Sequence, residues 1–466
     1  MRHNHKQIVA ELSRQVAKFY ACKQPFKIFH GSTNSTRIQV FKRSEMLDTS
    51  GLNRVLEIDT KRQTALVEPN VPMDRLVKAT LRHGLIPPVV MEFPGITVGG
   101  GVQGGAGESS SFRYGVFHET CESYEMIAGD GETLTCSPEK HPDLYYGTAC
   151  SYGTLGVMTA VKLRLIPAQK YVNLTYIPVQ SFDEAIKILQ KLKQEDYDYI
   201  DGIMYSKDRG VIMAGKLSDA AIDKVQHFTR ARDEWFYLHA DKIATNAQKI
   251  TEGIPVYDYL FRYDRGAFWM GMHAFKVFNV PFSHFWRTVL NWMLHARKLG
   301  VAMQESGISQ EYVVQDLAIP VEKATLFLKY INESFGIKPL WLCPLKTDHT
   351  SPFSSSNLDT SLVINVGVWS GAIRSRDEFL QINRAIEKKV SELGGKKWFY
   401  AHAYYPENEF WNLYRKDTYD ALRTKYHATH LPSTYDKVRV RDTFPIDTHR
   451  GLWRTLLGKA KLRIEP

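Results

Sequence analysis

The amino-acid sequence predicts an α+β fold, and three kinds of local pattern support this prediction. An apolar strand at 125–129 runs into Asp130 and Gly131, a dipeptide that is typical of a hairpin turn. The apolar run 362–368 is typical of a buried strand. Amphipathic helices with recognisable ends are expected at 73–82, 181–192 and 375–393.

Each expected helix has a start or stop signal. The first is followed by Gly84, as is common at a helix C-terminus. The second begins with Ser181 and Glu184, which have the spacing of a capping box. The third is stopped by Gly394. These signals fix helices in both halves of the chain.

Residues 97–111 contain six glycines and three serines. We expect a loop that brings backbone N–H groups and small hydroxyls against a large anion, and this indicates a nucleotide cofactor. Gly99, Gly101 and Gly104 match the G-x-G-x-x-G dinucleotide motif, but poor helix formers follow them, whereas that motif needs a helix N-terminus at the pyrophosphate. A glycine-rich turn without a ligand is the other alternative.

A second loop of the same kind follows an expected strand at 26–29. Residues 30–36 contain Gly, Ser, Thr and Asn, which form anion-binding nests of N–H groups and hydroxyls. Two such loops can hold one long, phosphate-bearing cofactor from both sides. Further along, 143–147 and 151–161 complete an ordered set of motifs.

This set of motifs over residues 26–161 resembles the FAD-linked oxidoreductases of the vanillyl-alcohol-oxidase or PCMH type. The resemblance implies a two-subdomain PCMH-type FAD-binding domain with an α+β cap. Asn34 stands where members with covalent flavin often carry His, and His30 stands where Arg is usual, so we expect non-covalent FAD. The residues implied to bind it are Gly31, Ser32, Thr33, Asn34, Ser35, Thr97, Val98, Gly99, Gly100, Gly101, Gly104, Gly105, Gly107, Glu108, Ser109, Ser110, Ser111, Gly156 and Val157.

Further segments resemble one branch of this family, the delta-24-sterol reductase (seladin or diminuto) branch. They include 55–61, 163–168, 311–316, 341–344 and 404–411. The resemblance implies reduction of a C=C bond in a lipid, such as a sterol side chain or a methylene-branched or unsaturated acyl chain. NADPH or NADH would be the reductant. The branch leaves the identity of the lipid open.

The expected domains follow from these markers. Residues 1–168 form the FAD-binding PCMH-type domain, 169–395 form the cap, and 396–466 return to the FAD-binding domain. For the cap we expect a sheet with helices on one face.

The charge of the chain helps to decide between nucleic acid and a membrane surface as a binding partner. Lys and Arg outnumber Asp and Glu by 60 to 50, a net charge of +10. A nucleic-acid motif or a concentrated basic stripe is lacking, so we expect no nucleic acid. Peripheral contact with an anionic membrane is favoured instead. Aromatic and apolar side chains gather at 268–294 between basic ones, which indicates either a segment that enters the membrane interface or a buried helical hairpin.

The chain has five cysteines without a C-x-x-C pair, which favours a reducing compartment. No uncharged apolar stretch reaches the about eighteen residues of a membrane span, so we expect a cytoplasmic protein, peripheral to a membrane at most. Metal-ligand spacing is also lacking, and we expect no metal. The subunit number is left open.

Reduction of an unactivated alkene needs a hydride from the flavin and a proton from a sheltered acid. Such an acid must keep its proton near neutral pH, as a buried carboxyl group or a histidine can. The candidates are Asp316, His402, Tyr404 and Glu409. Arg262, in a polar group with Asp264, would stabilise negative charge on the reduced flavin or bind a substrate headgroup. For each of them a salt bridge is the alternative.

Three function classes stay open: a lipid C=C reductase, an FAD-dependent oxidase or dehydrogenase of an alcohol or hydroxy acid, and a flavoprotein scaffold or lipid-binding chaperone. The same FAD-binding domain serves the first two, because the cap sets the substrate. The electron donor separates them, since a pyridine nucleotide should bleach the flavin only in a reductase.

Overall fold

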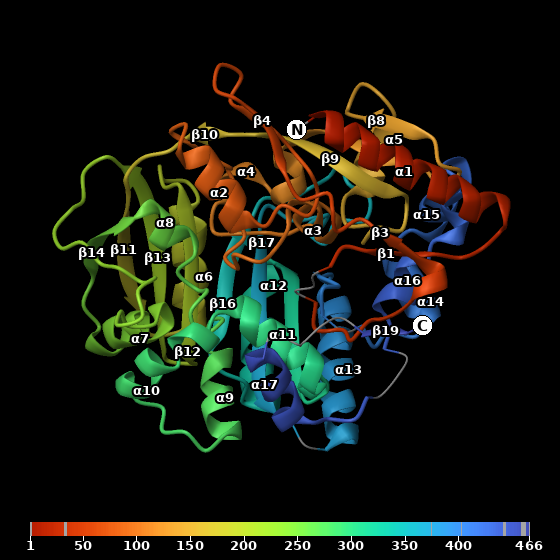
Figure 1. Ribbon diagram of the computed structural model, residues 1–466. Coiled ribbons are helices and arrows are strands. Elements are labelled where there is room, and N and C mark those ends of the chain that lie inside the picture. Colours follow the sequence, from red (N-terminus) through yellow and green to blue (C-terminus); the bar gives the residue numbers. More distant parts are fainter. Residues whose placement is uncertain are drawn as a thin grey trace.

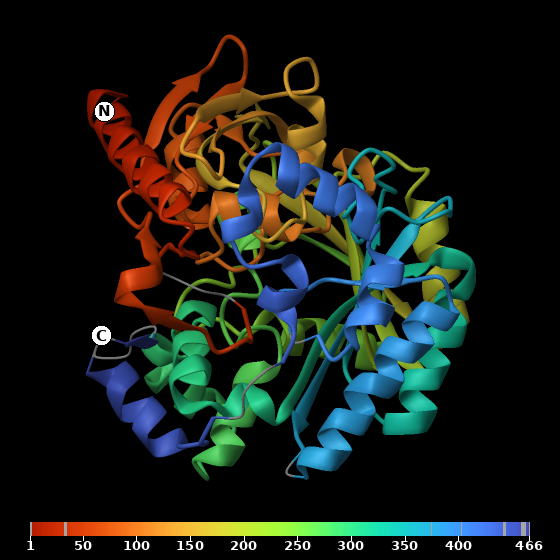
Figure 2. The ribbon, with the colours of Figure 1, turned by 90° about the vertical axis from the view of Figure 1, so that its right-hand side faces the viewer.

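The structure is a computed structural model that describes residues 2–31, 35–373, 375–401, 403–440, 444–457 and 463–465. Two antiparallel sheets organise the described part of the chain, one of five strands and one of eight. Figure 1 shows the smaller sheet above the larger, and Figure 2 shows C-terminal helices returning beside the N-terminal elements. The predicted α+β fold class is confirmed.

The five-stranded sheet has the order β4-β5-β9-β7-β8. Its hairpin between β7 and β8 turns at Asp130 and Gly131, as predicted, with Ile127 opposite Thr133. The backbone N–H of Glu132 donates to Asp130 Oδ1 at 3.0 Å, which fixes the turn. The strands are β4 (Val55–Asp59), β5 (Thr64–Val67), β9 (Val157–Arg164), β7 (Cys121–Ile127) and β8 (Thr133–Cys136).

The glycine-rich segment forms a short helix, α3 (Val98–Gly104), where we expected a loop. Thr97 caps it by accepting the N–H of Gly100 at 3.1 Å. A Cβ atom on Gly99 would lie 2.7 Å from Pro69 Cβ, and one on Gly101 would lie 2.5 Å from Met91 Cε. Tertiary packing therefore offsets the poor helix propensity of glycine, because glycine alone lets the helix approach this closely.

The eight-stranded sheet has the order β14-β11-β13-β12-β16-β17-β15-β18, and all its neighbours are antiparallel. The predicted strand at 362–368 is its β17. The strands are β14 (Ile250–Pro255), β11 (Tyr171–Val179), β13 (Arg209–Ser218), β12 (Tyr199–Ser206), β16 (Leu340–Leu345), β17 (Val363–Ala372), β15 (Tyr312–Pro320) and β18 (Lys396–Lys397).

Helices cover this sheet on both faces, so the expectation of helices on one face was wrong. One apolar core joins the sheet to α6 (Phe182–Leu192), α12 (Val321–Phe335) and α13 (Arg376–Glu392). A second core packs α7 (Phe236–Asn246) against β11 and β13. The physical reason is that β12 and β13 are apolar on both faces and buried along most of their length.

The remaining elements connect and flank the sheets. Two-stranded pairs join β1 (Lys27–Phe29) to β3 (Met46–Asp48), β2 (Val40–Lys42) to β19 (Arg463–Glu465), and β6 (Leu85–Ile86) to β10 (Ile166–Pro167). The helices are α1 (Arg2–Ala21), α2 (Met73–Leu81), α4 (Ser111–Tyr114), α5 (Pro142–Thr148), α8 (Val256–Leu260), α9 (Met270–Val277), α10 (His284–Val289), α11 (Ala296–Ser306), α14 (Glu407–Leu413), α15 (Lys416–Lys425), α16 (Thr434–Val438) and α17 (Thr448–Leu456).

The C-terminal segment packs on the N-terminal part through buried polar contacts. Arg423 Nη1 donates to the carbonyl oxygen of Thr154 at 2.9 Å, and the Tyr419 hydroxyl donates to Thr154 Oγ1 at 2.7 Å. The backbone N–H of Phe26 donates to the carbonyl oxygen of His430. The domain limits at 168 and 395 stay predictions.

The packing of α3 predicts opposite effects for two glycine substitutions. Gly99→Ala should lower the free energy of unfolding by about 1–3 kcal/mol, because its Cβ would overlap Pro69. Gly104→Ala meets nothing within 4 Å and should raise it by about 0.5–1 kcal/mol. Urea unfolding followed by circular dichroism measures both. Equal effects of the two variants would contradict the packing argument.

Candidate active site

A central cavity of about 740 Å³ lies between α3 and the eight-stranded sheet. One wall is formed by the glycine-rich segment and the residues around β1. The opposite wall is formed by β15, β16 and β17, and the far end by α9, α11, α17 and the residues between α10 and α11. The cavity thus connects the predicted cofactor loops with the cap.

Several predicted cofactor residues line the central cavity: Ser35, Thr97, Gly99, Gly100, Gly104, Gly107, Glu108 and Gly156. Others are buried but do not line the cavity, namely Val98, Gly101, Gly105, Ser109, Ser110, Ser111 and Val157, and Gly31 is exposed. Ser32, Thr33 and Asn34 lie outside the described residues.

The three serines after the glycine run make contacts inside the protein, which differs from the expected role of their hydroxyls against an anion. The Ser110 hydroxyl donates to the carbonyl oxygen of Pro88 at 2.8 Å. Ser111 Oγ accepts the N–H of Glu108 at 2.9 Å, and Ser109 Oγ lies 3.3 Å from the Tyr259 hydroxyl. These contacts hold the end of the glycine-rich segment in place, and binding of the cofactor by the three serines stays a prediction.

Basic side chains gather at the end of the cavity nearest β1. Arg37 is buried, and Lys437 donates to the carbonyl oxygen of Tyr152. Burial and the neighbouring Arg37 cation lower the pKa of Lys437 to about 8. Burial, with the positive charge of Lys437, lowers the pKa of His30 to about 4. Buried cations that destabilise one another favour a bound anion, so this end suits a pyrophosphate.

The middle of the cavity is formed by one face of the eight-stranded sheet. Asp316 on β15 and Trp341 on β16 both stand opposite Gly367 on β17, so all three share a face. A Cβ on Gly367 would lie 3.1 Å from Asp316 Oδ1 and 3.1 Å from Trp341 Cβ. Asn365 and Trp369 line the same wall. A carboxyl group is therefore held among indole rings.

Asp316 has the properties that a proton donor needs. Its Oδ2 accepts a hydrogen bond of 2.6 Å from the Tyr400 hydroxyl, and Oδ1 has no hydrogen-bond partner among the described residues. Burial raises the pKa of Asp316 to about 7, although the hydrogen bond from Tyr400 lowers it. The carboxyl group can thus hold a proton near neutral pH at the wall of the cavity.

Glu92 is a second carboxyl group at this wall, and sequence reasoning missed it. It lines the cavity, and its backbone N–H donates to Glu108 Oε1 at 3.1 Å. Burial raises the pKa of Glu92 to about 8, and the carboxylate of Asp316 adds to this effect. The sequence did contain a signal for Glu92, because it is a single acidic residue in the apolar run before the glycine-rich segment. The basic pair Arg37 and Lys437 had no such signal, because the two lie far apart in the sequence.

Arg262 does not line the cavity, so the expected role at the flavin or a headgroup is not supported. Its Nη2 donates to Asp201 Oδ2 at 2.7 Å, and both side chains are buried. Tyr263 and Trp341 donate to the same carboxylate oxygen at 2.8 and 3.2 Å. The salt-bridge alternative describes Arg262 better, and the pair supports the Trp341 wall from behind.

The other catalytic candidates are dispersed. Tyr404 lines a separate, smaller hollow, and its backbone N–H donates to Glu387 Oε1. Glu409 pairs with Arg384 at 2.7 Å on the surface. Asp264 pairs with His295 at 2.6 Å. His402 lies outside the described residues. Of these candidates, the structure brings Asp316 alone to the described cavity wall.

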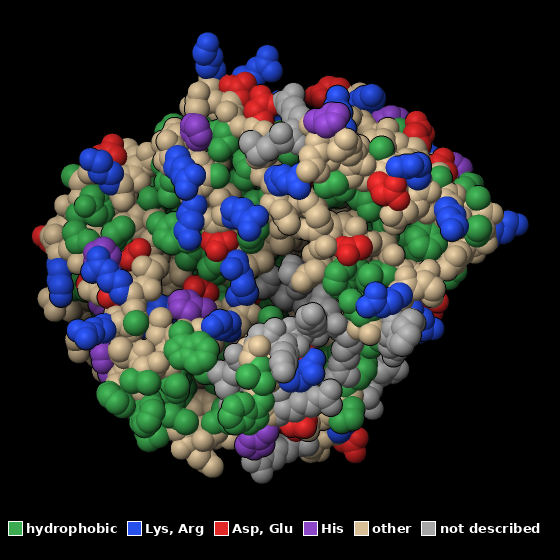
Figure 3. Space-filling view, in the orientation of Figure 1, with side chains coloured by type: hydrophobic (Ala, Val, Ile, Leu, Met, Phe, Trp, Pro, Cys, Tyr) green, Lys and Arg blue, Asp and Glu red, His purple; other side chains and the backbone are tan. Residues whose placement is uncertain are grey.

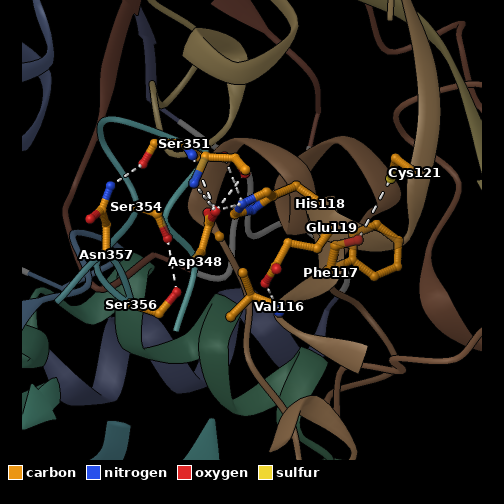
Figure 4. Close-up of polar contacts among 12 residues, drawn as sticks. Val116, Phe117, His118, Glu119, Cys121, Asp348, Ser351, Ser354, Ser356 and Asn357 are labelled. Carbon is orange, nitrogen blue, oxygen red and sulfur yellow. Dashed lines mark hydrogen bonds and ion pairs between the residues drawn. The ribbon is translucent and has the colours of Figure 1, made fainter. Parts of the chain in front are cut away.

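A buried ion pair between His118 and Asp348 lies next to the segment that follows α3 (Figure 4). His118 Nε2 lies 2.8 Å from Asp348 Oδ2 and 3.2 Å from Ser351 Oγ. Although burial lowers the pKa of His118, the hydrogen bond to Asp348 raises it to about 10. The pair fixes the loop after β16 against the segment that follows α3.

The Arg262 pair predicts a structural rather than a catalytic phenotype. Arg262→Met should lower the free energy of unfolding by about 3–5 kcal/mol, because it leaves the Asp201 carboxylate buried without its cation. The double variant with Asp201→Asn removes both charges and should recover much of this loss. Urea unfolding measures the effect. A stable Arg262→Met protein that lacks activity would instead assign Arg262 to catalysis.

Comparisons with known proteins identify a family domain and full-length relatives. Residues 7–137 match the family described as FAD binding domain. The delta(24)-sterol reductase of Homo sapiens is 30% identical over 451 residues, which cover 93% of this chain and 86% of that protein. The delta(24)-sterol reductase of Arabidopsis thaliana is 30% identical over 421 residues, with 82% and 74% covered.

A partial match reaches beyond this group. Cytokinin dehydrogenase 4 of Oryza sativa subsp. japonica is 30% identical over 149 residues, which cover 32% of this chain and 28% of that protein.

Among the described residues, none of the helices has the length and apolar character needed to cross a membrane.

The predicted resemblance is confirmed by the matched domain and by the extent of the full-length similarity. The chain belongs to the delta(24)-sterol reductase family and is an FAD-dependent oxidoreductase.

Proposed function

We propose that the chain reduces a C=C bond of a sterol or a related apolar lipid, with NADPH or NADH as the source of electrons. The observation that carries this proposal is the position of Asp316. Its buried carboxyl group, with a pKa raised by burial to about 7, lies between the glycine-lined and the apolar part of one cavity. An alkene that enters from the apolar part meets this acid next to the cofactor wall.

FAD, bound non-covalently and reduced, would supply the hydride. The glycines of α3 and Gly156 have no side chains, so the rings and the pyrophosphate of FAD would be able to approach the backbone there. Arg37 and Lys437 would neutralise the pyrophosphate, which removes the mutual destabilisation of these buried cations. This fit supports FAD at the end of the cavity nearest β1.

The chain's own residues would bind and orient the lipid. Trp341 and Trp369 present apolar ring surface at the middle of the cavity, and Phe275, Leu290 and Met293 extend that surface toward the far end. These side chains exclude water, so a proton at Asp316 is transferred to the substrate rather than exchanged with solvent. Tyr400 holds the carboxyl group in position through Oδ2.

The electron donor is tested by anaerobic addition of NADPH to the purified, oxidised protein. The visible absorption band of the flavin should bleach, and an unsaturated sterol or a branched acyl lipid should restore it. NADH in a parallel titration ranks the two donors. A band that resists both nucleotides but bleaches with an alcohol or hydroxy acid would support the oxidase or dehydrogenase class instead.

Asp316→Asn should slow the lipid-dependent reoxidation of the flavin by about 10²–10⁴-fold, because it removes the proton donor. Reduction by the nucleotide should be unchanged, since that step does not use the carboxyl group. In the wild type the protonated fraction of Asp316 falls as the pH rises through about 7, so reoxidation should slow above this pH. Stopped-flow absorbance across a pH series measures both effects.

Two further variants serve as controls for this assignment. Tyr400→Phe removes a hydrogen bond that lowers the pKa of Asp316, so the fall in rate should move to higher pH. Glu92→Gln should keep the step below pH 7 and move the fall in rate to lower pH, because it removes a carboxylate that interacts with Asp316. If Glu92→Gln abolishes the step and Asp316→Asn does not, Glu92 is the acid and the assignment to Asp316 is wrong.

A further inference from the structure

The segment between α9 and α11 faces solvent on one side and the central cavity on the other. Phe285, Val289 and Trp292 expose 64%, 48% and 50% of their surface. Leu290, directly after Val289, and Met293, directly after Trp292, line the cavity. The wall of the apolar end of the cavity is therefore thin here, and its outer surface is aromatic. We call the outward side chains Phe285, Trp286, Val289 and Trp292 the portal face.

Helix α17 borders the same end of the cavity. Its Thr448 and Thr455 line the cavity, whereas Trp453 exposes 62% of its surface. The rings of Phe278, just after α9, and His449 on α17 lie 6.0 Å apart, so the two elements are neighbours. Figure 3 shows hydrophobic side chains gathered over α10 and the adjoining helices. Several large exposed apolar groups on one short segment are unusual for a surface that only meets water.

Cationic side chains stand beside the portal face. Lys298 is exposed, lines the cavity and lies with Nζ 4.6 Å from the centre of the Trp292 ring. Lys276 and Arg297 are exposed nearby in the sequence, and Arg297 also pairs with Asp74 at 3.2 Å. Because an exposed residue such as Lys298 also lines the cavity, the cavity reaches the surface at this point.

We propose that the portal face docks on an anionic lipid bilayer and that the lipid substrate passes from the bilayer into the central cavity beside Lys298. The second half of this inference rests on the proposed function. Tryptophan and phenylalanine with adjacent lysine suit the interface of a bilayer, where the rings enter the headgroup region and the ammonium group meets lipid phosphate. The net charge of +10 favours an anionic surface. A sterol or long acyl chain is held in bilayers rather than in water, so an entrance on the bilayer side gives it a path without water.

Vesicle co-sedimentation tests the docking surface. The purified full chain should sediment with vesicles of phosphatidylcholine and phosphatidylglycerol, and much less with phosphatidylcholine alone or at high salt. The double variant Phe285→Ser with Trp292→Ser should weaken the partition by about tenfold or more, because two ring systems lose their contact with the bilayer. Leu326→Ser is the matched control, since Leu326 exposes 51% of its surface on α12. It should leave the partition unchanged.

Substrate entry is measured separately. Reoxidation of the reduced flavin is followed with the same unsaturated lipid, either embedded in anionic vesicles or dissolved in detergent. The double variant should be slowed with vesicles and not with detergent, whereas the Leu326→Ser control should match the wild type in both. A slowing in both conditions would overturn the role in entry. If no lipid reoxidises the flavin in any protein, the proposed function fails, but the sedimentation result still decides the docking.

Other outcomes would overturn the docking proposal. The proposal is wrong if the wild-type protein stays in the supernatant with both vesicle types. It is also wrong if the double variant sediments with the vesicles as the wild type does. Sedimentation velocity tests whether a second copy of this chain binds the portal face instead of a bilayer. A wild-type dimer that the double variant converts to a monomer, without vesicle binding, would assign the portal face to self-association.

Discussion

The alternation of side chains across the eight-stranded sheet is the constraint on which the site depends. Leu317 and Val366 point into the core beneath α12 and α13, while Asp316 and Asn365, one position away on the same strands, face the central cavity. A shift of one residue in the pairing of β15 with β17 would exchange these two sets. The pairing of Asp316 with Gly367, between two buried strands, therefore fixes where the Asp316 carboxyl group stands.

The two halves of the cavity are built by different means. Near β1, glycines leave the backbone open to the cavity, and the cationic side chains of Arg37 and Lys437 line the same end. In the middle and at the far end, large aromatic and aliphatic side chains replace water. Asp316 and Glu92 lie where these environments meet, and the apolar surroundings that exclude water also raise their pKa values. Binding of an apolar substrate and storage of a proton thus have one physical cause.

The portal face extends the same logic to the surface. A catalytic cavity that is apolar needs an entrance that does not require its ligand to cross water. The segment from α10 to α11 supplies inward-facing Leu290 and Met293 and outward-facing Phe285 and Trp292 within one short stretch. Within 268–294, Phe268 and Trp269 are buried whereas Phe285, Trp286 and Val289 on α10 are exposed, so entry of this segment into a membrane interface stays a prediction.

The sequence by itself determined the elements whose signals are local. The glycine and Asp-Gly motifs identified the family, and Ser181, Ser375 and Gly394 marked the ends of helices correctly. Only the tertiary structure decided the chemistry at the site, because pKa values depend on neighbours far apart in the chain. Asp316 and Tyr400 come from different elements, and α3 is helical because Pro69 and Met91 pack against its glycines. For Arg262 the sequence could not tell a buried ion pair from a ligand contact, because its partner Asp201 lies on β12, far away in the chain.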